Sequence, residues 1–202
     1  MQKFIAIAGT NSDQSTNRQL LQFMQTHFAD QAQIDLVEIK ALPMFNKPAD
    51  KQVPAAVKTI AAQIDQADGV IISTPEYDHA APAVLMNALE WLSYHIHPFV
   101  DKPVMIIGAS YGSLGTSRAQ AHLRQILDSP ELRARIMPSS EFLLGHSLQA
   151  FDDQGQLIDQ QKLAKLAGLF ADFQTFVTIT TQLKHANAAN QQEVRDFDWD
   201  NL

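Results

Sequence analysis

Short apolar runs alternate with segments of helical spacing along almost the whole chain. The runs cover residues 4–8, 34–39, 70–72, 104–108 and 139–145, and the helical segments cover residues 17–28, 54–64, 82–94, 118–127 and 161–183. Parallel neighbours in a sheet need crossover connections, so this alternation predicts a five-stranded parallel sheet with helices on both faces. We therefore expect a doubly wound three-layer α/β fold.

Length and composition are those of a single globular domain. The chain has 202 residues, of which 46% are hydrophobic, and this is enough to bury a full core. The apolar start at residues 4–8 leads into a polar loop, so we expect a first strand and neither a signal peptide nor a membrane span. Without cysteine, disulfides and thiolate chemistry are excluded, and a formal charge of −7 disfavours nucleic acid as main partner. By elimination we expect a cytoplasmic protein.

The chain divides into a domain and a tail. We expect residues 1–184 to form the α/β domain and residues 185–202 to form a polar, acidic arm, because QQEVRDFDWDN has no strong periodicity. Phe197 and Trp199 are candidates for holding this arm against a partner subunit, and a loose tail is the alternative. In doubly wound sheets ligands bind beyond the carboxyl ends of the strands, so the loops at 9–17, 40–53, 74–82 and 108–116 are the candidates for a site.

The first of these loops, GTNSDQSTNR, lies between a strand and the start of a helix. Hydroxyl and amide side chains, together with the N–H groups at the positive end of a helix dipole, suit a phosphate. A single Ser or Thr here would most simply cap the helix, but six polar residues favour a ligand. The loop matches neither GxGxxG nor GxxxxGK[ST], so a standard dinucleotide or nucleoside-triphosphate loop is not indicated.

The loops TPEYDHAAP and GASYGSLGTSR follow the third and fourth strands. Pro75 fixes the direction in which the chain leaves the sheet, and a rigid backbone can present N–H and C=O groups to a flat heteroaromatic edge. Glu76 and His79 are also explained as ordinary surface residues and Tyr77 as packing. The three glycines of the second loop favour a wrap around a planar ligand. The HIH pair at 95–97 has no third ligand at metal spacing, so no metal site is expected.

Taken together, these loops resemble the NADPH-dependent FMN reductase family of flavodoxin-like proteins over roughly residues 3–180. The resemblance rests on GTNSDQSTNR, TPEYDHAAPAVLMNALEWLS, and GASYGSLGTSRAQAHLRQIL with a later FDDQGQL. It implies a flavodoxin-like sheet of strand order 2-1-3-4-5. It also implies a set of FMN contacts: the phosphate on Thr10, Ser12, Ser15, Thr16 and Asn17, one edge of the isoalloxazine on Pro75, Glu76, Tyr77 and Asp78, and the other edge on Ser110, Tyr111 and Gly112.

Some positions depart from the family pattern. Ser12 stands where the family usually has arginine, which removes a charge-assisted contact to phosphate or NADPH. Asp78 replaces asparagine, and a carboxylate beside the flavin is expected to lower its reduction potential. Met86 and Glu90 replace a lysine and an aspartate in the helix that the family uses for subunit contacts.

The resemblance implies an FMN-dependent oxidoreductase. NADPH or NADH is expected to reduce FMN by hydride transfer, and a quinone, flavin, azo compound or similar small acceptor to take the electrons. No catalytic side chain is expected because the flavin carries the chemistry. The family also implies a homodimer or homotetramer. Two alternatives remain: a flavin-binding electron carrier or sensor without efficient NAD(P)H turnover, and a protein with lost flavin affinity that binds another ligand.

Overall fold

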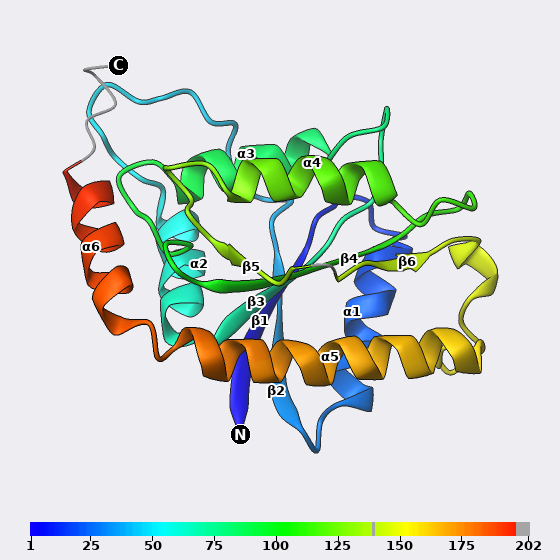
Figure 1. Ribbon diagram of the computed structural model, residues 1–202. Coiled ribbons are helices and arrows are strands. Elements are labelled where there is room, and N and C mark those ends of the chain that lie inside the picture. Colours follow the sequence, from blue (N-terminus) through cyan, green and yellow to red (C-terminus); the bar gives the residue numbers. More distant parts are fainter. Residues whose placement is uncertain (139, 197–202) are drawn as a thin grey trace.

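The computed structural model describes residues 1–138 and 140–196, and it confirms the doubly wound sheet (Figure 1). The strands are parallel and lie in the order β2-β1-β3-β4-β5, with β6 also paired to β4. This is the predicted order 2-1-3-4-5. The strand bounds are β1 Gln2–Ala8, β2 Ala32–Glu38, β3 Gly69–Ser73, β4 Pro103–Ala109, β5 Arg135–Ile136 and β6 Phe142–Leu144.

The fifth position of the sheet is filled by two short strands. β5 pairs with the start of β4, where Val104 lies opposite Ile136, and β6 pairs with its end, where Ile107 lies opposite Phe142. Between the two strands lies Pro138, which has no N–H to donate to β4. The sequence predicted one strand at 139–145. Its apolar end is correct, but the first contact with β4 occurs earlier in the chain.

Helices cover both faces of the sheet (Figure 1). Side chains of β1 alternate between two cores: Ile5 and Ile7 pack with α2, α3 and α4, and Phe4 and Ala6 pack with α1 and α5. None of the helices in the described ranges is long and apolar enough to span a bilayer. The helix bounds are α1 Thr16–His27, α2 Ala55–Gln66, α3 Ala83–Leu92, α4 Ser117–Leu127 and α5 Gln160–Thr180.

Part of the predicted polar arm is a helix, α6, which spans Lys184–Arg195. Polar contacts attach it to the domain. Asn190 donates to Asp101 over 2.8 Å, and Arg135 both donates to Asn187 over 2.8 Å and pairs with Asp101 over 2.7 Å. Because these contacts use amides and charges, no apolar period marks them in the sequence. Phe197 and Trp199, the candidates for holding a partner, lie outside the described residues.

Candidate functional site

A cavity of about 350 Å³ lies at the carboxyl edge of the sheet, where the loops after β1, β3 and β4 meet. Its volume is within the range of small-molecule sites, roughly 300–1,000 Å³. All of the cofactor residues predicted from the sequence line it except Thr10 and Asp78. The lining consists of Ser12, Gln14, Ser15, Thr16, Asn17, Pro75, Glu76, Tyr77, Ala109, Ser110, Tyr111 and Gly112.

The loop after β1 forms the polar end of the cavity. Ser15 is the N-cap of α1, and its hydroxyl accepts a hydrogen bond from Arg18 N over 3.3 Å. The first N–H groups of a helix have no intrahelical acceptor, so the N–H groups of Thr16 and Asn17 are available to an anion. Thr10 is fully buried and accepts from Ser12 N over 3.1 Å. Thr10 therefore stabilises the loop from the protein interior.

Arg18 also supports this loop from outside the cavity. Its guanidinium donates to the carbonyl oxygen of Ser12 over 2.7 Å and to Glu38 over 2.9 Å. The hydrogen bond that Arg18 donates to the Glu38 carboxylate raises the pKa of Arg18. Among the described residues that line the cavity there is no lysine or arginine. An anion bound here would therefore rely on hydroxyls, N–H groups and the helix dipole.

Asn17 ties the three loops together. Its amide donates to Ala109 O over 2.8 Å, and its oxygen accepts from Ala109 N and from the Ser73 hydroxyl, both over 2.9 Å. The side chain is almost completely buried. The sequence identified Asn17 as a phosphate contact, and in the structure its side chain bonds to the ends of β3 and β4. A ligand would meet its backbone N–H.

The loop after β3 ends in a two-residue hairpin turn. Tyr77 N donates to Ala80 O over 3.2 Å, and Ala80 N donates to Tyr77 O over 2.9 Å. Asp78 and His79 occupy the turn with φ of 49° and 64°, as a type I′ turn requires. Asp78 is exposed and lines an adjoining cavity instead of the one described above. Its predicted effect on a flavin remains a prediction.

Glu76 connects this loop to α4. Its Oε2 accepts from the backbone N–H groups of Arg118 over 3.0 Å and Ala119 over 3.2 Å. The N-cap of α4, Thr116, makes no side-chain cap hydrogen bond of its own, so Glu76 supplies the missing acceptor. The carboxylate thus stabilises the start of α4 and holds two walls of the cavity together.

The end of β4 and the loop that follows it are shaped by Ser110 and by two glycines, Gly108 and Gly115. The Ser110 hydroxyl donates to Gly112 O and accepts from Gly115 N, both over 3.0 Å. Gly115 has φ of +59°, and a Cβ on Gly108 would lie 1.8 Å from Thr116 Oγ1. A Cβ on Gly112 would meet nothing within 4 Å. Close packing accounts for Gly108 and Gly115, and the expectation that this loop wraps a planar ligand stays a prediction.

Sequence reasoning missed Ser147 and Gln14. The buried hydroxyls of Thr16 and Ser147 are hydrogen-bonded over 2.8 Å although the residues lie 131 positions apart. No pattern near Ser147 indicates this contact. Gln14 lines the cavity, and its position inside the polar loop GTNSDQSTNR was a usable signal.

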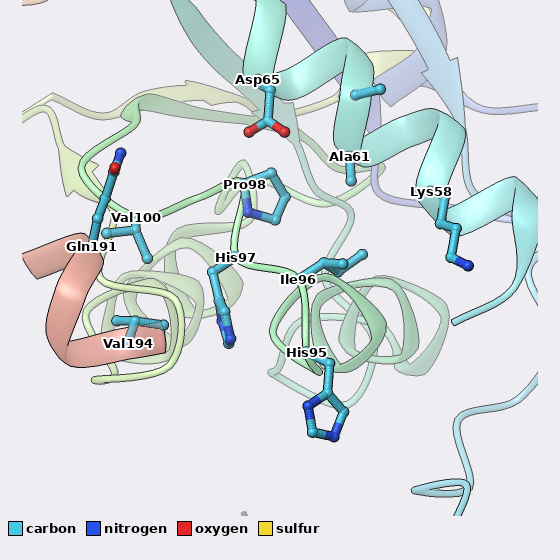
Figure 2. Close-up of a pocket in the computed structure, with 11 residues that line it drawn as sticks. Lys58, Ala61, Asp65, His95, Ile96, His97, Pro98, Val100, Gln191 and Val194 are labelled. Atoms are coloured by element: carbon cyan, nitrogen blue, oxygen red, sulfur yellow. The ribbon is translucent and has the colours of Figure 1, made fainter. Parts of the chain in front are cut away.

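A separate cavity of about 480 Å³ lies between α2, the segment after α3 and α6 (Figure 2). His97 faces Val194 of α6 there, while His95 points away. Burial lowers the pKa of His97, and its Nδ1 lies 3.3 Å from Glu131 O. Within the described ranges no three His, Asp or Glu side chains are placed to hold a metal ion.

The arrangement at the sheet edge fits a ligand with an anionic end and a flat body. Comparisons with known proteins also point to such a ligand. The family model described as NADPH-dependent FMN reductase matches residues 2–149. The chain is 62% identical over 180 residues to the NADH:(hydroxy)cinnamate reductase subunit CrdA of Vibrio ruber, with 89% of each chain covered.

Two further proteins are similar to this chain. The NADH-dependent flavin reductase subunit 2 of Lactobacillus johnsonii is 44% identical over 180 residues, which cover 87% of this chain and 97% of that protein. The solved structure of FerB, a flavoenzyme NAD(P)H:(acceptor) oxidoreductase from Paracoccus denitrificans, superposes with a TM-score of 0.79 at 24% identity. That comparison covers 89% of this chain and 99% of FerB, and it shows a common flavodoxin-like fold.

Proposed function

The chain belongs to the NADPH-dependent FMN reductase family, and we propose that the cavity formed by the loops after β1, β3 and β4 is its FMN site. The protein is an FMN-dependent oxidoreductase that uses NAD(P)H. Bound FMN would supply the redox chemistry between the nicotinamide and a second acceptor such as a quinone or free flavin. The observation that carries the proposal is that the N-terminus of α1 and the loops after β3 and β4 line one cavity.

Different residues of this cavity bind the phosphate and the ring of FMN. The hydroxyls of Ser12, Ser15 and Thr16 and the first N–H groups of α1 hold the phosphate. The backbone and side chains of residues 75–77 and 109–112 hold the ring. Because no side chain needs to transfer a proton, the protein contributes position, hydrogen bonds and exclusion of water.

Anaerobic reduction tests this function directly. Purified protein is loaded with FMN, separated from free flavin, and mixed with NADH or NADPH under nitrogen. We expect the visible absorbance of the bound flavin to bleach with at least one nucleotide and to return when a quinone is added. A protein that binds no FMN, or whose FMN stays oxidised with both nucleotides, would overturn the proposal.

A second candidate function is delivery of electrons to a protein partner. Two of the relatives described above are named as subunits, and large apolar side chains surround the proposed flavin site. Tyr77 and Tyr111 line the cavity and are 50% and 59% exposed, and Leu114 in the loop after β4 is 49% exposed. Leu148 is 60% exposed and follows Ser147, whose hydroxyl is hydrogen-bonded to that of Thr16. Exposed apolar residues beside a functional cavity favour contact with another chain.

Rates distinguish the two functions. For a small-molecule reductase, steady-state turnover with quinones or free flavin approaches the single-turnover rate of flavin reduction by NAD(P)H. For an electron-delivering subunit, flavin reduction is fast and turnover is slow with every small acceptor.

We also propose a homodimer or homotetramer in the cytoplasm, where NAD(P)H is supplied. Sedimentation of the isolated protein measures its oligomeric state, and the mass of a single chain would contradict the proposed dimer or tetramer.

A further inference from the structure

A second cavity of about 430 Å³ adjoins the proposed flavin site. Glu76, Ser110 and Gly112 line both cavities, so the two lie side by side at the loops after β3 and β4. The second cavity adds three charged or titratable residues: Asp78, His79 and Arg118. A dinucleotide is longer than a flavin ring. When its nicotinamide reaches the flavin, its other half must therefore cross a neighbouring surface.

The backbone fixes Asp78 and His79 at the rim of this cavity. Both residues have positive φ in the hairpin turn whose ends, Tyr77 and Ala80, are joined by two hydrogen bonds. The His79 side chain is 73% exposed, and Asp78 is also exposed. The turn therefore presents one carboxylate and one imidazole to solvent without the freedom of an open loop.

Arg118 is held beside this turn. Its Nη1 lies 2.8 Å from His79 Nδ1 and 3.8 Å from Glu76 Oε1. Its side chain remains 52% exposed. A guanidinium has five N–H donors in a rigid fork, so the contact with His79 leaves others for the oxygens of a phosphate. Since Glu76 also accepts two backbone N–H groups of α4, its charge only partly offsets that of Arg118.

We propose that this second cavity binds the adenosine-diphosphate half of the co-substrate and that its charges select NADH over NADPH. The inference rests on the proposed flavin function. Arg118 binds the pyrophosphate, and the carboxylate of Asp78 accepts a hydrogen bond from the 2′-hydroxyl of the adenosine ribose. The same carboxylate repels a 2′-phosphate. Asp78 is therefore a specificity residue.

Nucleotide binding tests the site apart from turnover. FMN-loaded protein is titrated by calorimetry with ADP and with adenosine 2′,5′-bisphosphate. We expect ADP to bind the wild type, and Arg118→Gln to weaken ADP binding by about tenfold, the loss typical of one charge-assisted phosphate contact. Arg118→Lys keeps the charge and recovers part of the affinity. Lys165→Gln, on the exposed side of α5, is the matched control and should bind ADP as the wild type does.

Specificity is tested at Asp78. Removing its charge in Asp78→Asn should improve binding of adenosine 2′,5′-bisphosphate and raise kcat/KM for NADPH several-fold, with much less effect on NADH. Asp128→Asn removes the same charge at the other end of α4 and should change neither. The Arg118 variants should raise KM for NADH more than they change kcat.

Three results would overturn the inference: no ADP binding by the wild type, equal use of NADH and NADPH, or an Asp78→Asn variant indistinguishable from Asp128→Asn. Failure of the proposed function gives a different result: neither NADH nor NADPH then reduces the bound FMN, regardless of whether ADP binds. If Arg118→Gln loses its flavin, the Asp78 and Asp128 pair still decides the question, since both positions are exposed.

Discussion

Glu76 Oε2 lies 3.0 Å from the backbone nitrogen of Arg118, so a residue in the loop after β3 caps the helix that follows β4. The same oxygen accepts from Ala119 N over 3.2 Å. A carboxylate is favoured at this end of a helix because the dipole is positive there. The contact makes the position of one wall of the proposed flavin site depend on the other.

Replacing Glu76 should therefore weaken both the fold and FMN binding. We expect Glu76→Ala to lower the free energy of unfolding by about 1–2 kcal/mol, the usual cost of losing a helix cap. Glu76→Gln keeps an oxygen acceptor and should lose about half as much, because hydrogen bonds to a charged group are roughly twice as strong. Urea unfolding with and without FMN measures both effects. Equal stability of the two variants would contradict the capping role.

Asn17 should be one of the least tolerant residues of the site. Asn17→Ala leaves Ala109 N, Ala109 O and the Ser73 hydroxyl without their partner in a buried environment. We expect the free energy of unfolding to fall by about 2–4 kcal/mol, since each buried unsatisfied group costs roughly 1–3 kcal/mol and local rearrangement recovers part of that cost. Gln22→Ala on the exposed side of α1 is the control, and its unfolding midpoint in urea should remain that of the wild type.

An arginine at position 12 should strengthen FMN binding. The cavity relies on hydroxyls and a helix terminus for the phosphate, and Ser12→Arg adds a cation at its rim. A charge-assisted contact of about 1.5 kcal/mol corresponds to roughly tenfold tighter binding. The gain should shrink at high salt because exposed charges are screened. Fluorescence titration of FMN at low and high salt measures this, with Gln22→Arg as the control for added charge. Equal affinity of the two variants would show that the phosphate does not lie near position 12.

The glycines of the loop after β4 should differ in their tolerance of a side chain. Gly115 has φ of +59°, and a Cβ there would lie 2.6 Å from the backbone of Leu143. We expect Gly115→Ala to lower the free energy of unfolding by about 2–3 kcal/mol through strain and overpacking. Gly112→Ala meets nothing within 4 Å and should retain the stability of the wild type. Thermal unfolding of the pair is the measurement, and similar melting temperatures would refute the packing argument.

His97 should make stability depend on pH. Burial lowers its pKa in the folded state below the ordinary value of 6.5. As pH falls through that value, the unfolded chain binds the proton first, so the free energy of unfolding decreases. His97→Gln should remove this decrease in the free energy of unfolding at low pH. His95→Gln, at an exposed position, should keep most of the decrease. Urea midpoints from about pH 7.5 to about pH 5.5 measure the difference. Parallel pH profiles for His97→Gln and the wild type would exclude the effect.

Much of the fold and the site location could be predicted from local patterns. Apolar runs and helical spacing record which residues are buried, and the carboxyl ends of parallel strands meet at one edge whatever the details of packing. The polar loop at 9–17 and the stiff turn after Pro75 therefore pointed to one cavity before any contact was known.

Partners distant in the chain were decided only by the tertiary structure. The Thr16–Ser147 contact, the bonds of Asn17 to β3 and β4, and the capping of α4 by Glu76 join residues that no local window contains. The same is true of α6, which is attached through Asn187 and Asn190 without an apolar stripe. The sequence by itself determined the alternation of strands and helices, because burial period is a local property. Which side chains face a ligand and which hold the loops in place was settled by packing, because a hydrogen bond depends on distance in space and not along the chain.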